Sequence, residues 1–162
     1  MARRVVAWLP PSCGLGRIAA HKAPKLFFYD CGLVCHLLGI HDPEQLDTHP
    51  LRGAIFENWV FAELAKAMRN TGRRTELCFW RTHGGQEVDF LFEVAGRLFG
   101  VEAKAGMTVR PGALTSLRHT LAQWPELKPQ AVVVHGGDEE SSLLDCRLLP
   151  WRRIGQLVPP PK

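Results

Sequence analysis

The sequence predicts an α/β fold in which a mixed β-sheet is flanked by helices. Three patterns support this prediction. A long amphipathic helix is predicted at 54–70, two alternating strands joined by a short turn follow at 87–94 and 98–104, and the apolar run at 131–134 has the character of a buried central strand. The chain has 162 residues, 46% of them hydrophobic, which suits one domain with a substantial core.

The N-terminal part is predicted to consist of short elements. Residues 5–9 and 25–30 are candidate strands. Asp30 is a favoured N-cap residue and predicts a helix over 32–38. The Asp-Pro and His-Pro steps within 41–53 are typical of turns, so this stretch is predicted to be a loop.

The helix at 54–70 carries an acidic residue in an unusual position. Apolar residues recur at the three- and four-residue spacings of a helical stripe, and Glu57 lies within this stripe, whereas Asn58 lies outside it. An unpaired carboxylate is costly to bury. Glu57 therefore needs a partner, such as a metal ion, a lysine or an arginine.

Most of the candidate chemistry lies in the two strands at 87–94 and 98–104. Strand periodicity gives the first strand one face with carboxylates, including Asp89, and one wholly apolar face of even-numbered residues. The second strand carries Glu102 and Lys104 on one face. If the strands pair, these three side chains converge. Two carboxylates and a lysine on adjacent strands indicate either a site for a hard cation with an activating base or a structural lysine–carboxylate network.

The neighbours of this patch have simpler interpretations. Glu87 is expected either to join the cation site or to be solvated at the end of its strand, and Glu93 is expected to be solvated. Trp80 is expected in the core. Arg81 is expected in a salt bridge rather than in contact with a phosphate.

The C-terminal part is predicted to alternate helices and strands. Pro111 occupies a favoured first position of a helix. The remaining predicted elements are the strand at 131–134, a loop at 136–142, a strand at 146–149, a short helix at 151–157 and an extended Pro-rich tail at 159–162.

The bulk composition argues against a membrane protein and against a disulfide framework. The net charge is +4, and this excess is too small to indicate nucleic-acid binding by itself. No apolar run approaches the ~18 residues that a membrane span requires. The five cysteines are odd in number and scattered, which fits reduced thiols. We therefore expect a cytoplasmic protein with no membrane partner.

Four runs carry a resemblance to a known family. They are KAPKLFFYDCGL at 22–33, GAIFENWVFAEL at 53–64, FWRTHGGQEVDFLFE at 79–93 and GVEAKAG at 100–106. The order of an acidic helix, an aspartate and a Glu-Ala-Lys strand resembles the PD-(D/E)XK restriction-endonuclease-like fold. More closely, the four runs resemble the DUF4143-type C-terminal domain of prokaryotic AAA-type (P-loop) ATPases, from about residue 23 to the C-terminus.

The resemblance implies a restriction-endonuclease-like fold and a nuclease-like site that uses Mg²⁺ or Mn²⁺. Asp89, Glu102 and the carbonyl of Ala103 would hold the ion, with Glu57 as an auxiliary acidic ligand. Lys104 would orient or deprotonate the attacking water. The implied catalytic residues are therefore Lys104, Asp89 and Glu102, and the implied substrate is nucleic acid.

The resemblance also implies a division of the chain. In that family an ATPase module and a winged-helix segment precede this domain, but the motif G-x-x-x-x-G-K-S/T is absent here, so no ATPase activity is expected of this chain. Residues 1–24 would be a remnant of the upstream linker or winged-helix segment, 25–158 the nuclease-like domain and 159–162 the tail. An ATPase module would then be a partner in cis or in trans.

Two alternative functions remain open at this point. One is a non-catalytic accessory or interaction module of an ATPase, with a degenerate acidic site. The other is a component of a toxin–antitoxin or defence system.

Overall fold

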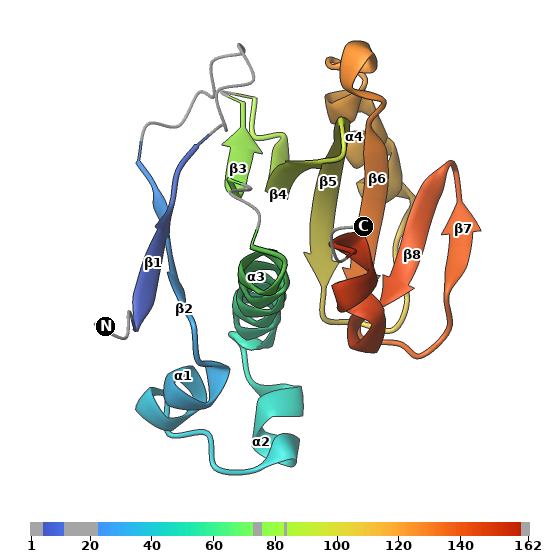
Figure 1. Cartoon of the computed structure of the whole chain (residues 1–162). Helices are drawn as coiled ribbons and strands as arrows, with labels where there is room; N and C mark the ends of the chain where they lie inside the picture. The colour runs from blue at the N-terminus through green and yellow to red at the C-terminus, as the bar shows by residue number, and fades with distance from the viewer. Residues whose placement is uncertain (1–4, 12–22, 73–75, 83, 160–162) are drawn as a thin grey trace.

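The structure is a computed structural model that describes residues 5–11, 23–72, 76–82 and 84–159. Strands β3 to β8 form one sheet in the order β3-β4-β5-β6-β8-β7, and β1 and β2 form a separate two-stranded sheet (Figure 1). The predicted α/β fold with a mixed sheet flanked by helices is confirmed. The elements are β1 (Val6–Leu9), β2 (Lys25–Phe28), α1 (Cys31–Leu37), α2 (Pro43–Thr48), α3 (Arg52–Asn70), β3 (Cys78–Arg81), β4 (Glu87–Val94), β5 (Arg97–Lys104), α4 (Pro111–Leu121), η1 (Pro125–Leu127), β6 (Gln130–His135), β7 (Ser141–Leu143), β8 (Cys146–Pro150) and η2 (Trp151–Leu157).

The large sheet changes from antiparallel to parallel pairing at β5. Strands β3, β4 and β5 pair antiparallel, β5, β6 and β8 pair parallel, and β7 closes the far edge antiparallel to β8. Helix α4 connects β5 to β6, because parallel neighbours need a long crossover connection. The predicted apolar strand lies within the sheet as β6, where Val133 and Val134 have no exposed surface.

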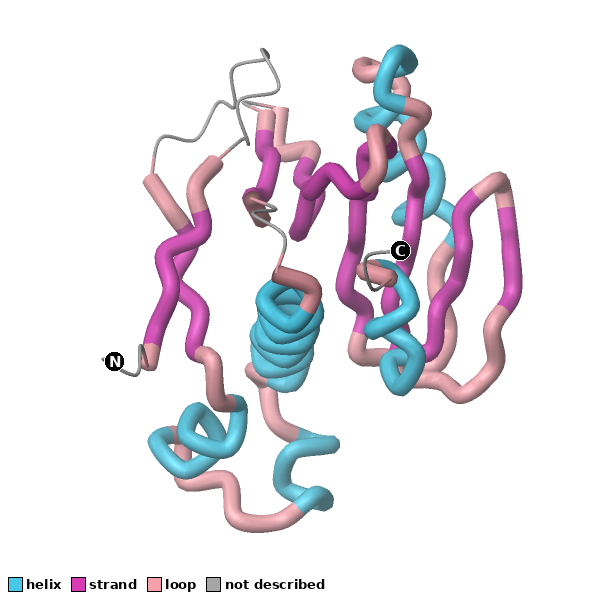
Figure 2. The backbone as a smooth tube through the Cα atoms, in the orientation of Figure 1, coloured by secondary structure: helices cyan, strands magenta, loops and turns pink. Residues whose placement is uncertain are grey.

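Helices cover both faces of this sheet (Figure 2). Helices α3 and η2 contribute Leu64 and Ile154 to the hydrophobic cluster on one face. Helix α4 contributes Leu117 to the cluster on the other face. Successive residues of β6 alternate between the two, since Val134 belongs to the first cluster and Val133 to the second.

Helix α3 also fastens the small sheet to the rest of the molecule through Asn58. The Oδ1 of Asn58 accepts the N–H of Phe28 at 2.7 Å, and its Nδ2 donates to the carbonyl of Phe28 at 3.0 Å. Asn58 is only 7% exposed, although its position outside the apolar stripe predicts a solvated side chain. The burial is tolerated because the amide satisfies both backbone groups at the end of β2.

Two elements lie where the sequence predicts loops. Helix α2 (Pro43–Thr48) forms within 41–53, and its cap Asp42 accepts the N–H of Gln45 at 2.8 Å. Strand β7 (Ser141–Leu143) overlaps the predicted loop 136–142, and it is exposed throughout, so it has no apolar face that a periodicity argument can detect. The predicted C-terminal helix is a 3₁₀ helix, η2.

The N-terminal strand is part of the folded structure. Strand β1 pairs antiparallel with β2, and Leu9 is 2% exposed in the cluster under α3. Of the predicted segment 1–24, residues 5–11, 23 and 24 are described, and the other residues lie outside the described ranges. Of the predicted tail 159–162, only Pro159 is described.

The cysteines differ in part from the expectation of reduced thiols. Cys31, Cys35 and Cys146 are free, whereas Cys78 is disulfide-bonded. The expectation is therefore wrong for Cys78, and the cysteine pattern gives no support to a reducing compartment. Within the described ranges, no helix has the length and apolar character needed to cross a membrane.

Replacing Asn58 with alanine is expected to lower the free energy of unfolding by about 2 kcal/mol, because the N–H and C=O of Phe28 lose their partner. Urea denaturation measures this loss. Asn70→Ala, at the exposed end of α3, is the matched control and is expected to change stability by less than about 0.5 kcal/mol. Equal effects of the two substitutions would contradict the role assigned to Asn58.

Candidate functional site

A β-bulge in β4 takes Asp89 out of regular alternation. Two steps along β3, from Cys78 to Trp80, are matched by three steps along β4, from Leu91 to Val88. One extra residue therefore lies next to Asp89. Val88 and Leu91 consequently belong to the same hydrophobic cluster, under α4, although strict alternation predicts opposite faces. The predicted wholly apolar even face is wrong at Val88.

The ladder between β4 and β5 ends beside this bulge. Its last backbone pair joins Phe90 to Val101. Beyond this pair the Oδ2 of Asp89 accepts the N–H of Ala103 at 2.9 Å. A carboxylate thus takes the place of a backbone acceptor where the two strands part. Asp89 is 9% exposed in this position.

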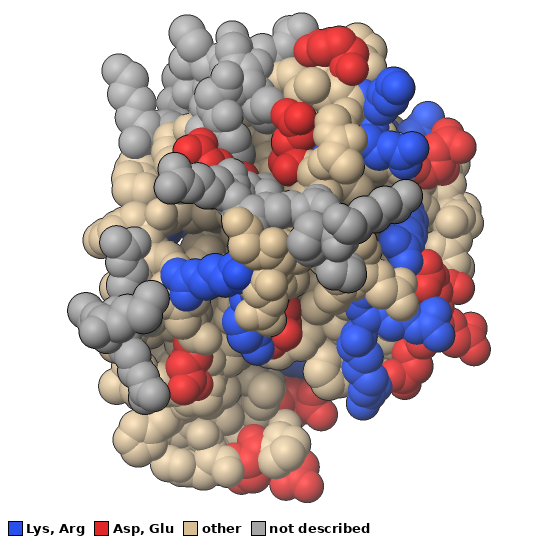
Figure 3. Space-filling model, viewed as in Figure 1, with Lys and Arg blue, Asp and Glu red and all other residues tan. Residues whose placement is uncertain are grey.

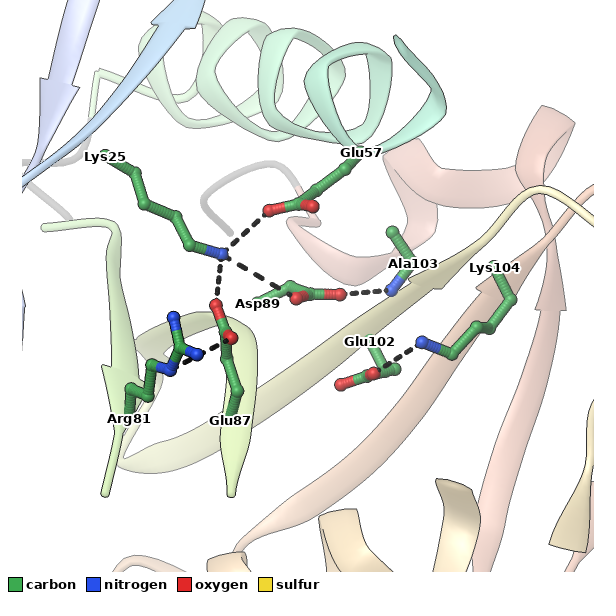
Figure 4. A network of polar contacts seen from close by, with 8 residues as sticks. All are labelled: Lys25, Glu57, Arg81, Glu87, Asp89, Glu102, Ala103 and Lys104. Atoms are coloured by element: carbon green, nitrogen blue, oxygen red, sulfur yellow. Dashed lines mark hydrogen bonds and ion pairs between the residues drawn. The ribbon is translucent and has the colours of Figure 1, made fainter. Parts of the chain in front are cut away.

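The ammonium group of Lys25 lies among three carboxylates (Figure 4). Its Nζ is 2.9 Å from Oε1 of Glu57, contacts Oε1 of Glu87 and is 3.9 Å from Oδ1 of Asp89. These residues come from β2, α3 and β4, so one side chain joins three elements. The expectation that Glu57 needs a partner is confirmed, and among the described residues that partner is a lysine.

Sequence reasoning assigned no role to Lys25. Its position at the start of a short strand, 32 residues before Glu57, gives no local signal of contact. The available signal was indirect: the misplaced carboxylate of Glu57 required a cation. Glu87 was expected either to join the site or to be solvated, and its contact with Lys25 places it in the site.

The predicted face of β5 is confirmed. The Nζ of Lys104 donates to Oε1 of Glu102 at 2.6 Å. Two neighbouring predictions are also confirmed: Nε of Arg81 lies 3.6 Å from Oε2 of Glu87, and Trp80 is buried in the core.

Burial and crowded negative charge alter the acidity of the site. Burial, followed by the charges of Glu102 and Glu57, raises the pKa of Asp89 to about 8. The N–H of Ala103 and the charge of Lys25 oppose this shift without cancelling it. Burial also raises the pKa of Glu102, against the hydrogen bond from Lys104. Its surroundings therefore favour the protonated form of Asp89.

The pKa values of the two lysines are also raised, but against the effect of burial. Burial acts to lower the pKa of Lys25, but the hydrogen bond with Glu87 and the charge of Glu57 outweigh burial, so the pKa is raised. For Lys104, the hydrogen bond with Glu102 and the charge of Glu102 likewise outweigh burial and raise the pKa. Both side chains are ammonium ions at neutral pH.

The described charges nearly balance without a metal ion. Four carboxylates stand against three cations; the carboxylates are Glu57, Glu87, Asp89 and Glu102, and the cations are Lys25, Arg81 and Lys104. A proton on Asp89, which the raised pKa favours, would remove the one excess negative charge. A divalent cation would therefore compete with a lysine and a proton.

The carboxylate ligands suit Mg²⁺ or Mn²⁺, but three of the carboxylates already lie around the ammonium group of Lys25. Carboxylate oxygens are the hard ligands that these ions prefer. Within residues 5–11, 23–72, 76–82 and 84–159, however, no group of three or more His, Cys, Asp or Glu side chains is arranged to hold a metal ion. The residues fit such an ion in kind, and an ion bound by Glu57 and Asp89 would have to displace Lys25 from these carboxylates.

Comparison with known proteins places these residues in a family. Residues 52–154 match the family described as "Domain of unknown function (DUF4143)". Uncharacterized protein Rv2008c of Mycobacterium tuberculosis and Uncharacterized protein Mb2031c of Mycobacterium bovis are each 34% identical to the chain over 115 residues. Each match covers 71% of this chain and 24% of the relative, so the chain spans about a quarter of the length of these relatives. The four residues predicted to act through their side chains lie within 52–154, whereas Lys25 does not.

Asp89→Asn is expected to stabilise the protein at alkaline pH, because asparagine keeps an acceptor for Ala103 without a titrating proton. The pKa of Asp89 is higher in the folded chain, at about 8, than in the unfolded chain, at about 3.9, so the wild type loses stability as pH rises through this window. At pH 8 the variant is expected to exceed the wild type by roughly 1–3 kcal/mol.

Urea denaturation between pH 5 and pH 8 measures this difference. Glu93→Gln, on the exposed side of β4, is the matched control and is expected to show no such trend. A stability difference between Asp89→Asn and wild type that stays constant across this range, or shrinks with rising pH, would contradict the assignment.

Proposed function

The chain belongs to the DUF4143 family, and we propose that it is a nuclease-like domain that hydrolyses nucleic-acid phosphodiester bonds with Mg²⁺ or Mn²⁺. The observation that supports this proposal is the crowding of Glu57, Asp89 and Glu102, from three different elements, beside Lys104. Strongly perturbed carboxyl groups in contact with a lysine are typical of functional sites. A restriction-endonuclease-like fold is part of the same proposal, because the mixed sheet presents the acidic residues on neighbouring strands.

The proposed roles are those that the family resemblance implies for these residues. Asp89 and Glu102 would hold the ion together with the carbonyl of Ala103, and Glu57 would be an auxiliary ligand. When bound, such an ion stabilises negative charge on the transferring phosphate and acidifies a water molecule. The raised pKa of Lys104 keeps its ammonium charged, so this residue would orient the attacking water as a hydrogen-bond donor.

We further propose that the domain works as one module of a longer protein. Its relatives are about four times longer than the matched region, which covers 24% of their length. The resemblance to C-terminal domains of AAA-type ATPases identifies an ATPase module as the proposed partner, in cis or in trans. Nucleotide hydrolysis by that module would then supply the energy, and this domain the contact with nucleic acid.

Lys25 favours a second candidate function, a non-catalytic interaction module. Its ammonium already neutralises part of the acidic cluster and ties Glu57 on α3 to Glu87 on β4. Such a cluster can have a purely structural role. Removing one partner of a buried ion pair lowers the free energy of unfolding by more than forming the pair raises it. The two candidates differ in whether a divalent cation can replace Lys25.

Lys25→Gln is expected to make Mn²⁺ bind at least about tenfold more tightly than to wild type, because the competing ammonium is removed. Isothermal titration calorimetry measures the dissociation constant. Lys66→Gln, which removes an exposed lysine paired with Glu63 on α3, is the matched control and is expected to leave the constant unchanged. Loss of stability in Lys25→Gln without any Mn²⁺ binding would support the non-catalytic module.

The wild-type protein is expected to cleave labelled DNA or RNA when Mg²⁺ or Mn²⁺ is present. Asp89→Asn and Lys104→Ala are each expected to reduce the cleavage rate by about 100-fold or more, because each removes a group that acts at the reacting phosphate. Gel analysis of single-turnover reactions gives the rates. Glu93→Gln should retain activity, and cleavage that survives both site substitutions would refute the catalytic assignment.

A further inference from the structure

A cavity of about 370 Å³ lies at the carboxyl ends of the parallel strands β5, β6 and β8. Ala105, Gly136 and Trp151 directly follow these strands and contribute to its lining. In Figure 1 the ends of β5 and β8 are the arrowheads at the lower edge of the sheet, on the side of α1 and α2. Ligands of α/β proteins commonly bind outside the carboxyl ends of parallel strands.

The lining is tightly built where β5 and β6 end. The N–H of Gly136 donates to the carbonyls of Lys104 and Gly106, at 3.1 Å each. A Cβ atom at position 136 would lie 2.4 Å from the carbonyl oxygen of Ala105, so only glycine permits this approach. Closely packed backbone therefore forms this part of the cavity lining.

The cavity and the acidic site are built on two shared elements. On α3 the lining residue Phe56 directly precedes Glu57, and on β5 the lining residue Ala105 directly follows Lys104.

Aromatic rings form the walls. Trp59 and Phe56 are stacked, with ring centroids 6.0 Å apart, and Trp59 meets Trp151 edge to face at 5.2 Å. Both tryptophans are partly exposed, and no hydrogen bond joins either indole N–H to another described residue. Flat rings with free donors suit a planar ligand that carries acceptor atoms, such as a nucleobase.

A cation at the rim suits the backbone of such a ligand. The side chain of Arg52 is 41% exposed and lies 3.4 Å from Asp47, whose side chain is 71% exposed. Exposed ion pairs contribute little to stability, so this guanidinium is available to a phosphate.

Elsewhere the visible positive charge is largely paired. Arg152 and Arg153 bind carboxylates of Asp138 and Glu140, and in Figure 3 lysines and arginines on the face shown lie among acidic residues. On that face, binding would rest on stacking more than on a broad basic patch.

We infer that this cavity receives an unpaired nucleobase of single-stranded nucleic acid. The inference rests on the proposed function for the class of ligand, a nucleic acid, but base binding itself needs no cleavage. It specifies the substrate class as single strands or frayed ends, because a base within a duplex cannot stack on the cavity wall without leaving its partner.

Fluorescence anisotropy of a labelled 12-nucleotide single strand, as DNA and as RNA in the presence of EDTA, tests the inference. Trp59→Leu is expected to raise the dissociation constant about 5- to 150-fold, the range for loss of one stacked base. Trp59→Phe keeps a ring and is expected to retain most of the affinity. Trp8→Leu is the matched control, because Trp8 is 66% exposed on β1 and does not line the cavity.

Trp151→Leu, at the ring that meets Trp59 edge to face, gives a second test if Trp59→Leu does not fold in a thermal unfolding assay. Unchanged affinity in both wall variants, or an equal loss in Trp8→Leu, overturns the inference. Full competition by AMP at matched concentration also overturns it, since the cavity would then hold a free nucleotide. Weaker binding by Trp59→Leu supports it even if the wild type cleaves nothing, an outcome that removes only the proposed nuclease activity.

Discussion

The ion pairs of Lys25 are the interaction on which the acidic site depends. They hold the first residue of β2 against Glu57, while the next residue of α3, Asn58, holds the last residue of β2, Phe28. Two consecutive side chains of one helix thus fasten both ends of a strand. Because Lys25 also contacts carboxylates of β4, the same ammonium fixes the distance between α3 and the sheet and makes the crowding of negative charge tolerable.

The local features of the fold and site followed from the sequence, and the long-range features did not. Alternation along β5 predicts the shared face of Glu102 and Lys104, since strand geometry alone determines it. The bulge beside Asp89 depends on how β3 pairs with β4, which no single strand encodes. The contacts of Lys25 and Asn58 were missed for the same reason, since their partners lie about thirty residues away in the sequence. A periodicity argument predicts only that such polar side chains are exposed.

The acidic site and the aromatic cavity have different chemical characters but share α3 and β5. The site concentrates buried charge that is balanced by a lysine and a proton, and the cavity offers flat apolar walls with free indole donors. Charge would select the phosphate of a ligand and stacking its base. The arrangement would suit the proposed nucleic-acid ligand without a broad basic surface. A divalent cation would have to displace the ammonium of Lys25 from the carboxylates.

The protonation of Asp89 tests this account most directly. Carbon-13 NMR of the Asp89 side-chain carboxyl, assigned by comparison with Asp89→Asn, follows its titration between pH 3 and pH 10. Burial, together with the charges of Glu102 and Glu57, predicts a midpoint near the pKa of about 8. This midpoint should fall when Mg²⁺ is added at saturating concentration. A midpoint near the ordinary aspartate value of about 3.9, unaffected by Mg²⁺, would contradict it.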